Sequence, residues 1–168
     1  TLEEIDSAVK FKLGFPMGIF ELADFTGMDV IHKATVEMHL RDKKVINPHS
    51  TVEKMFDAKK LGQKSGEGYY KYSDDKYERV ELSEELAGKC NPIQLVANIL
   101  NNAAWLITNG ASDIDEIEKA AKLGLGLKKP LFETAKEIGI KNIVDELNNL
   151  AEKHGEFYKP DPLLESMI

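Results

Sequence analysis

The chain has 168 residues, of which 42% are hydrophobic and 30% charged, and these are the proportions of an ordinary globular protein. Its formal net charge of −7 gives a surface that repels phosphate backbones, so nucleic acid is excluded as an expected partner. The single cysteine, Cys90, excludes an intrachain disulfide framework, and no apolar run is long enough to span a bilayer. Because no signal peptide opens the chain either, we expect a cytoplasmic protein that does not enter a membrane.

Helices joined by glycine-marked turns are predicted for the first half of the chain. Thr1 and Glu4 have the spacing of a capping box that begins a helix, and Gly14 ends it. A short second helix is predicted to start at Phe20 and to stop at Gly27.

A third and a fourth helix follow. The third covers residues 29–42, and the spacing of its apolar residues allows either of two faces to point toward the core. One face carries Val30, Ala34 and Met38, and the other carries Ile31 and Thr35. A capping box at residues 50–53 begins the fourth helix, which we expect to end near residues 61–62.

The second half begins after two polar segments. Glycines and tyrosines at residues 62–72 indicate a loop or a short Gly/Tyr-rich extended arm, and the charged segment 73–90 indicates a connector. A long apolar helix is then predicted for residues 91–109. It leads into a second helical region in which Asp113 and Glu116 again have capping-box spacing.

An internal repeat relates the two halves. Shifted by 112 positions, residues 2–56 align without a gap with residues 114–168, and glycines, prolines and apolar positions match. A register kept over that length predicts the same fold twice. We therefore expect an all-α chain of two tandem helical units: a first unit at 1–72, a connector at 73–90 and a second, degenerate unit at 91–168. Since Thr1 stands where Asp113 stands in the repeat, the first unit is expected to have lost a leading helix upstream.

Two motifs resemble a known family, the C-terminal domain of the 3-hydroxyacyl-CoA dehydrogenases. The first runs from residue 13 to residue 24 and continues to Asp29: Leu13-Gly14-Phe15-Pro16-Met17-Gly18-Ile19-Phe20-Glu21-Leu22-Ala23-Asp24. The second is Lys60-Leu61-Gly62-Gln63-Lys64-Ser65-Gly66-Glu67-Gly68-Tyr69-Tyr70-Lys71-Tyr72. Their order and separation are similar to those of the family. The resemblance is strong over 1–72 and degenerate over 91–168, where Lys128, Lys129 and Pro130 replace Pro16, Met17 and Gly18.

The resemblance implies a fold and a function. The fold would be the one of the 6-phosphogluconate dehydrogenase C-terminal domain, and the parent would oxidise 3-hydroxyacyl-CoA to 3-ketoacyl-CoA with NAD in fatty-acid β-oxidation. The catalytic residues and the NAD site would lie in an N-terminal Rossmann-type domain, so this chain would hold no catalytic residue and no cofactor. It would contact the acyl-CoA substrate and the chain's own N-terminal domain. It would also provide dimerisation, as a homodimer or as an intrachain pseudo-dimer of the two units.

The turn before the second helix is the candidate substrate-binding segment. Phe15, Pro16, Met17 and Phe20 make a stiff apolar turn, and methionine adapts its shape to an acyl chain. The backbone amides at residues 18–20 are expected to be exposed and able to face an oxygen or an anion. Glu21 recurs as Glu133, which indicates a structural role. For Met17 and Phe20, a purely packing role is the alternative.

Other candidate sites are weaker. The four histidines are spread along the chain and predict no metal site, and Gly124-Leu125-Gly126 lacks the preceding strand of a dinucleotide fingerprint. Two other functions stay open: a non-catalytic helical assembly module, and a related two-domain dehydrogenase of a non-CoA hydroxy acid.

Overall fold

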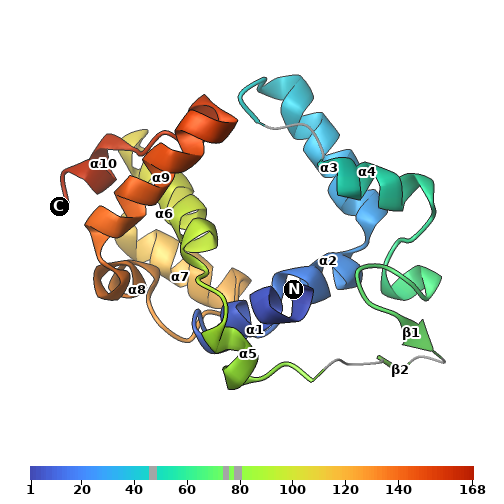
Figure 1. Cartoon of the computed structure of the whole chain (residues 1–168). Coiled ribbons are helices and arrows are strands. Elements are labelled where there is room, and N and C mark those ends of the chain that lie inside the picture. Colours follow the sequence, from blue (N-terminus) through green and yellow to red (C-terminus); the bar gives the residue numbers. More distant parts are fainter. Residues whose placement is uncertain (46–48, 74–75, 78–80) are drawn as a thin grey trace. The chain divides into compact units, whose positions relative to one another are not determined.

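The computed structural model describes residues 1–45, 49–73, 76–77 and 81–168 (Figure 1). This described part is helical apart from one short ribbon, which confirms the predicted all-α class. It divides into two compact units: the first comprises Thr1–Val9 and Met17–Cys90, and the second comprises Lys10–Pro16 and Asn91–Ile168. The segment Lys10–Pro16, which the sequence places in the first unit, thus packs with the second half of the chain.

The first unit contains short helices and a two-stranded antiparallel ribbon. Its described elements are α1 (Leu2–Phe11, whose last two residues belong to the second unit), α2 (Ile19–Thr26), α3 (Met28–Arg41), α4 (Ser50–Asp57), the 3-10 helix η1 (Gln63–Ser65), β1 (Tyr72–Ser73), β2 (Lys76–Tyr77) and α5 (Glu84–Gly88). In the ribbon, Tyr72 pairs with Tyr77 and Ser73 pairs with Lys76. The predicted connector at 73–90 therefore contains α5 and part of the ribbon, while its residues 74–75 and 78–80 lie outside the described part.

Most helix boundaries in the first unit are the predicted ones. The Thr1 hydroxyl accepts a hydrogen bond from the Glu4 amide at 3.3 Å, as a capping box requires. Gly27 has a φ of 97° and both ends α2 and begins α3. Of the two faces proposed for α3, Val30, Ala34 and Met38 are exposed.

The second α3 face is the more buried one, and α4 ends earlier than predicted. Ile31 and Thr35 are half-buried, and α3 packs against α4. The cap of α4 is His49, whose Nδ1 accepts from the Thr51 amide at 3.2 Å, in place of the predicted box at 50–53. The helix stops at Asp57 because the chain turns sharply there, with a φ of 59° at Lys59.

The second unit is built around a long helix. Its elements are α6 (Ile93–Thr108), α7 (Ile114–Gly124), α8 (Leu131–Ile138), α9 (Ile140–His154), the 3-10 helix η2 (Glu156–Tyr158) and α10 (Pro162–Glu165). Helix α6 packs against α8, α9 and α10, and Figure 1 shows α6 and α9 side by side. The core of this unit is apolar: Leu100, Ile143, Leu147 and Leu164 expose no area at all.

Corresponding helices in the two units begin at corresponding positions. Helices α3 and α9 begin at Met28 and Ile140, and α4 and α10 begin at Ser50 and Pro162, so both pairs are offset by the 112 positions of the sequence repeat. The glycines before α3 and α9 have φ angles of 97° and 93°. The described part of the first unit contains no helix ahead of α1 that corresponds to α6, which precedes α7 in the second unit. Within these same ranges, no helix is long and apolar enough to cross a membrane.

Candidate functional site

The predicted site segment is the turn that joins α1 to α2. Phe15 is half-buried and packs against the apolar core of the second unit, and Pro16 is exposed. Met17 is half-buried in the first unit. Phe20, in the first turn of α2, is half-buried with its ring centroid 4.6 Å from that of Tyr69. The four residues thus divide between the units, with Phe15 and Pro16 in the second and Met17 and Phe20 in the first.

The amides at the start of α2 are bonded to carboxylates of the chain itself. Asp6 Oδ1 accepts from the Phe20 amide at 2.8 Å, and Asp6 Oδ2 accepts from the Glu21 amide at 3.1 Å. The Gly18 amide donates to Glu21 Oε2 at 2.8 Å. The amides of Gly18 and Phe20 thus face an anion, as expected, but the anion in each case is a carboxylate of the chain itself. Asp6 is the anion that this helix N-terminus stabilises.

This arrangement requires glycine at position 18. A Cβ atom on Gly18 would lie 2.2 Å from Asp6 Cγ, much closer than atoms can approach. Gly18 is therefore the residue that lets α1 and α2 come together with the Asp6 carboxylate between them.

A second buried carboxylate, Asp24, holds the arm at residues 62–72. Its Oδ1 accepts from the Tyr69 amide at 2.9 Å, and its Oδ2 accepts from the Tyr70 amide at 2.9 Å and from the Tyr72 hydroxyl at 2.8 Å. The Tyr70 hydroxyl donates to Asp6 Oδ2 at 2.8 Å. The two sequence motifs are thus one hydrogen-bonded assembly, which we call the carboxylate clasp: Asp6, Glu21, Asp24, Tyr69, Tyr70 and Tyr72.

The arm is a loop around the Asp24 carboxylate, the first of the two predicted forms, and its last residue, Tyr72, begins strand β1. The 3-10 helix η1 begins after Gly62, and isolated bridges pair Gly62 with Glu67 and Glu67 with Lys71. A Cβ atom on Gly62 would lie 2.2 Å from the carbonyl oxygen of Asp24, and one on Gly68 would lie 2.1 Å from Asp24 Oδ1. The glycines allow the close approach, because two consecutive amides must reach one carboxylate.

The clasp concentrates negative charge inside the first unit. Asp6, Glu21 and Asp24 expose 0%, 2% and 1% of their surface. Burial raises the pKa of Asp6, and the nearby Glu21 carboxylate raises it further, while the hydrogen bonds from Phe20, Tyr70 and Glu21 act in the opposite direction. Because backbone amides and tyrosine hydroxyls of the chain donate to them, these acids have a structural role, as the sequence indicates for Glu21.

The second unit repeats part of this arrangement. Glu118 lies at the position equivalent to Asp6 and accepts from the Leu131 amide at 2.6 Å and the Phe132 amide at 2.8 Å. Glu133, the equivalent of Glu21, is exposed instead and lies 4.0 Å from Lys129. Neither Asp6 nor Asp24 is among the site residues predicted from the sequence. The alignment of Asp6 with Glu118 in the repeat, each ahead of a helix start, was the signal that could have identified the first of them.

Two lysines in or next to the arm pair with acids of the same unit. Lys60 Nζ lies 2.6 Å from Glu67 Oε1, and Lys64 donates to the Asp29 carboxylate. Each interaction lowers the pKa of the acid, since the ammonium group stabilises its charged form.

Neither a metal site nor a dinucleotide site is found in the described ranges. No group of three or more His, Cys, Asp or Glu side chains there has the geometry to hold a metal ion. His32 stacks on Phe56 with ring centroids 4.3 Å apart, which is a packing role. Gly124 ends α7 and no strand precedes it, so residues 124–126 do not form a phosphate-binding turn for NAD.

Comparison with known proteins matches both halves of the chain to one family. The family described as "3-hydroxyacyl-CoA dehydrogenase, C-terminal domain" matches residues 1–72 and, separately, residues 94–168. The mitochondrial hydroxyacyl-coenzyme A dehydrogenases of Rattus norvegicus and Homo sapiens are 40% and 39% identical to the chain over 72 residues, which is 42% of this chain and 23% of each relative. The chain thus matches about a quarter of the length of these relatives.

Solved structures show the same fold. The 3-hydroxybutyryl-CoA dehydrogenase of Escherichia coli superposes with a TM-score of 0.77 and 20% identity, covering 99% of this chain and 54% of that one. The dehydrogenase part of multifunctional enzyme 1 from Caenorhabditis elegans superposes with a TM-score of 0.65 and 22% identity, covering 98% of this chain and 41% of that one. Because the family model matches most of the residues of this chain, in two stretches, the chain belongs to the 3-hydroxyacyl-CoA dehydrogenase C-terminal domain family.

Proposed function

We propose that this chain is the substrate-side and dimerisation portion of an NAD-dependent 3-hydroxyacyl-CoA dehydrogenase of fatty-acid β-oxidation. The family match supports the enzyme class, and the relatives from rat and human are named hydroxyacyl-coenzyme A dehydrogenases. The catalytic residues and NAD belong to an N-terminal Rossmann-type domain of the parent, so the 168 residues alone do not reduce NAD. The relatives are described as mitochondrial, and a cytoplasmic setting stays a prediction.

The observation that carries the proposal is the carboxylate clasp behind the α1–α2 turn. Gly18 and Phe20 are held by backbone hydrogen bonds to Glu21 and Asp6, and the Phe20 ring rests on Tyr69. A turn fixed in this way offers a pre-ordered apolar surface, and pre-ordering lowers the entropic cost of binding. We propose that Phe15, Pro16, Met17 and Phe20 contact the acyl chain of the substrate.

The tandem arrangement suggests the role of the second unit. Its helices begin at the positions of the first unit, but Lys128, Lys129 and Pro130 replace the apolar turn. We propose that the units arose by duplication and that the second takes the place of a dimer partner within one chain. Light scattering of the parent enzyme tests this, because a two-fold dimer formed through the second unit would contradict it.

Steady-state kinetics of the parent enzyme test the substrate role. With 3-hydroxybutyryl-CoA and NAD, we expect NADH to form, and Met17→Ala to lower kcat/KM about tenfold, the equivalent of the roughly 1.5 kcal/mol that burial of an apolar side chain contributes. Leu123→Ala is the control, because Leu123 is 74% exposed in the second unit.

Four results would contradict the proposal. Equal kinetics for Met17→Ala and the unsubstituted parent would remove the turn from the substrate site. Turnover of free 3-hydroxy acids without CoA would favour the dehydrogenase of non-CoA acids, and a parent with neither activity would favour the assembly module. NAD reduction by the 168 residues alone would overturn the division of roles between domains.

A further inference from the structure

The arm carries three tyrosines, Tyr69, Tyr70 and Tyr72, whose hydroxyl groups have different partners. The Tyr70 hydroxyl donates to Asp6 at 2.8 Å, and the Tyr72 hydroxyl donates to Asp24 at 2.8 Å. Tyr69 donates to Asp24 through its backbone amide, and its hydroxyl has no hydrogen-bond partner among the residues that the structure describes. Two of the three hydroxyls therefore stabilise the clasp, and the third is available to a ligand.

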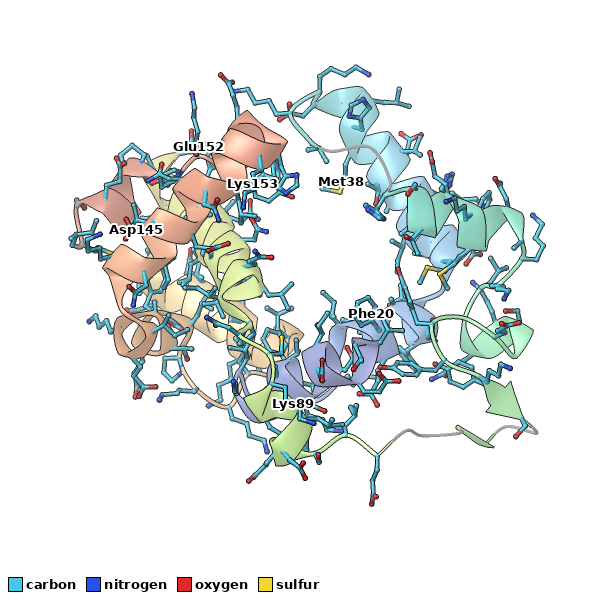
Figure 2. All side chains as sticks on the ribbon, viewed as in Figure 1. Phe20, Met38, Lys89, Asp145, Glu152 and Lys153 are labelled. Carbon is cyan, nitrogen blue, oxygen red and sulfur yellow. The ribbon has the colours of Figure 1, made fainter. Side chains whose placement is uncertain are left out.

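Tyr69 lies beside the candidate substrate-binding turn. Its ring centroid is 4.6 Å from that of Phe20, and the two ring planes are tilted by 57°. Phe20 lies in the first turn of α2, where Figure 2 labels it, and both residues are half-buried. A ligand that packs on Phe20 therefore comes within reach of Tyr69. Because a tyrosine hydroxyl that becomes buried needs a hydrogen-bond partner, such a ligand has to offer an acceptor.

The surroundings of Tyr69 favour one kind of acceptor. Burial raises the pKa of its hydroxyl, and the Asp24 carboxylate raises this pKa further, so the group stays protonated at neutral pH and can donate. The clasp that includes Tyr69 contains three buried acids, Asp6, Glu21 and Asp24. Their negative charge disfavours a phosphate or a carboxylate as the acceptor, whereas a neutral carbonyl oxygen avoids the repulsion. An acyl-CoA offers such oxygens in its thioester and in the amides of its pantetheine arm.

We propose that the Tyr69 hydroxyl donates a hydrogen bond to a carbonyl oxygen of the acyl-CoA substrate when the acyl chain packs on Phe20. Within the arm, Tyr70 and Tyr72 then bind the buried acids, and Tyr69 contacts the substrate. The inference rests on the proposed function, because it needs a CoA thioester bound at the α1–α2 turn. It adds a residue of the second sequence motif to a site whose predicted residues all lie in the first motif.

Tyr69→Phe in the full-length parent enzyme tests the proposal, because the substitution removes the hydroxyl and keeps the ring and the backbone amide. With 3-hydroxybutyryl-CoA and saturating NAD, we expect KM to rise and kcat/KM to fall by about threefold to tenfold, the effect of one neutral hydrogen bond. We expect kcat to stay the same, since a bond made equally in the ground state and the transition state contributes to binding alone. Thermal unfolding should give the Tm of the unsubstituted parent, because the hydroxyl has no partner in the described part of the chain.

Two other tyrosines provide matched controls. Tyr158, in the second unit, is also half-buried, burial also raises its pKa, and its hydroxyl also has no partner among the described residues. Tyr158→Phe should leave KM and kcat unchanged. Tyr70→Phe removes a donor to the buried Asp6 carboxylate, so it should lower the Tm, which Tyr69→Phe should not do.

A truncated substrate identifies the carbonyl. The S-ethyl thioester of 3-hydroxybutyric acid keeps the thioester carbonyl and lacks the amides of CoA. If the loss of kcat/KM on Tyr69→Phe is seen with the CoA thioester and disappears with the ethyl thioester, the acceptor is an amide oxygen. If the loss is the same with both substrates, the acceptor is the thioester oxygen.

Three outcomes would overturn the proposal. One is equal kinetics for Tyr69→Phe and the unsubstituted parent, because the hydroxyl would then face only water. Another is a fall in kcat with KM unchanged, since the hydroxyl would then act in the chemical step and not in binding. The third is a loss of Tm as large as that of Tyr70→Phe, which would make the hydroxyl structural. In all three cases Met17→Ala still lowers kcat/KM, whereas a parent that does not turn over the CoA thioester contradicts the proposed function itself.

Discussion

Helices α2 and α8 begin at equivalent positions of the two units, but different contacts stabilise the two helix starts. Both helices begin beneath a carboxylate from the preceding helix, Asp6 in the first unit and Glu118 in the second. Asp6 is fully buried and also accepts from the Tyr70 hydroxyl, whereas Glu118 is half-buried and accepts from the two helix amides. In the first unit the carboxylate is part of a larger assembly. In the second it is a cap, and an apolar core around α6 stabilises the unit.

The comparison shows what each unit depends on. The first unit places three buried acids between α2 and the arm, so its stability depends on hydrogen bonds whose loss leaves charge buried. The second unit depends on packing of α6 with α8 and α9, where the cost of a substitution follows the volume removed. The predictions below separate these dependencies. Trp105, the only tryptophan, lies on α6 and reports on the second unit by fluorescence.

The largest effect is expected for Asp24→Ala. The substitution leaves the amides of Tyr69 and Tyr70 and the Tyr72 hydroxyl without their acceptor, and we expect the free energy of unfolding of the first unit to fall by about 3–5 kcal/mol. Urea denaturation followed by circular dichroism measures the loss, while Trp105 fluorescence should show the second unit unfolding as before. Asp115→Ala, on an exposed residue of α7, is the control. Equal stability of the two variants would show that the clasp does not stabilise the first unit.

Gly62→Ala is expected to destabilise the first unit by about 3 kcal/mol. Gly62 has a φ of 89° and a ψ of −147°, and its Cβ would overlap the backbone of Asp24, so strain and a clash act together. Gly110→Ala is the matched control: Gly110 also has a positive φ, 68°, but its Cβ would meet no atom within 4 Å. We expect about 1 kcal/mol for the control, from backbone strain alone. Similar losses for both would mean that close approach to Asp24 is unimportant.

A smaller difference is expected between Asp6→Ala and Glu118→Ala. Loss of Glu118 removes a helix cap, at about 1 kcal/mol, whereas loss of Asp6 also leaves the Tyr70 hydroxyl without its acceptor, for about 2–3 kcal/mol in total. Thermal unfolding of both variants, with Trp105 fluorescence to identify the second unit, gives the two values. A loss for Glu118→Ala as large as that for Asp6→Ala would remove the distinction between cap and clasp.

The smallest effect is a difference in pH dependence between Asp6 and Asp29. The pKa of Asp6 is raised above its ordinary value of 3.8, so the folded state binds more protons just above that pH and the contribution of Asp6 to stability falls as pH rises through the raised pKa. The pKa of Asp29 is lowered by Lys64, so its contribution is present above pH 3.8 and is lost as pH falls through the lowered pKa.

Asparagine variants of both residues test these signs. Above pH 3.8, ionisation of Asp6 lowers the free energy of unfolding of the unsubstituted chain. We expect Asp6→Asn to remove this loss, so that the free energy of unfolding rises more steeply with pH in the variant than in the unsubstituted chain. Asp29→Asn should reduce the loss of stability at more acidic pH. Denaturation curves over this pH range measure both slopes. Identical slopes in the two variants would show that neither acid has the environment described.

Much of the fold was predictable because local rules determine it. Gly27 ends one helix and begins the next because a residue with positive φ is needed there, and Asp113 caps α7 through the predicted hydrogen bond to Glu116. The all-α class follows from helical spacing of apolar residues. The error at α4 came from the turn at Lys59, because a positive φ at a lysine has no signature in the sequence.

The candidate site was predicted less well. Residues 15–20 do form a stiff turn, but their helix amides are bonded to Asp6 and Glu21, and an acid fourteen residues away cannot be paired with an amide from spacing alone. The contact of the arm with Asp24 escaped prediction for a related reason. The tyrosines of the arm favour extended chain locally, and only the Asp24 carboxylate, 45 residues earlier, draws their amides into a turn.

The sequence by itself determined the helices, their glycine boundaries and the equivalence of positions offset by 112, because these depend on neighbouring residues and on composition. Only the tertiary structure decided which acids are buried, which faces of α3 are covered and with which unit residues 10–16 pack. Those properties depend on contacts between segments far apart in the chain. The physical reason is that a carboxylate or an apolar face has no fixed environment until another segment covers it.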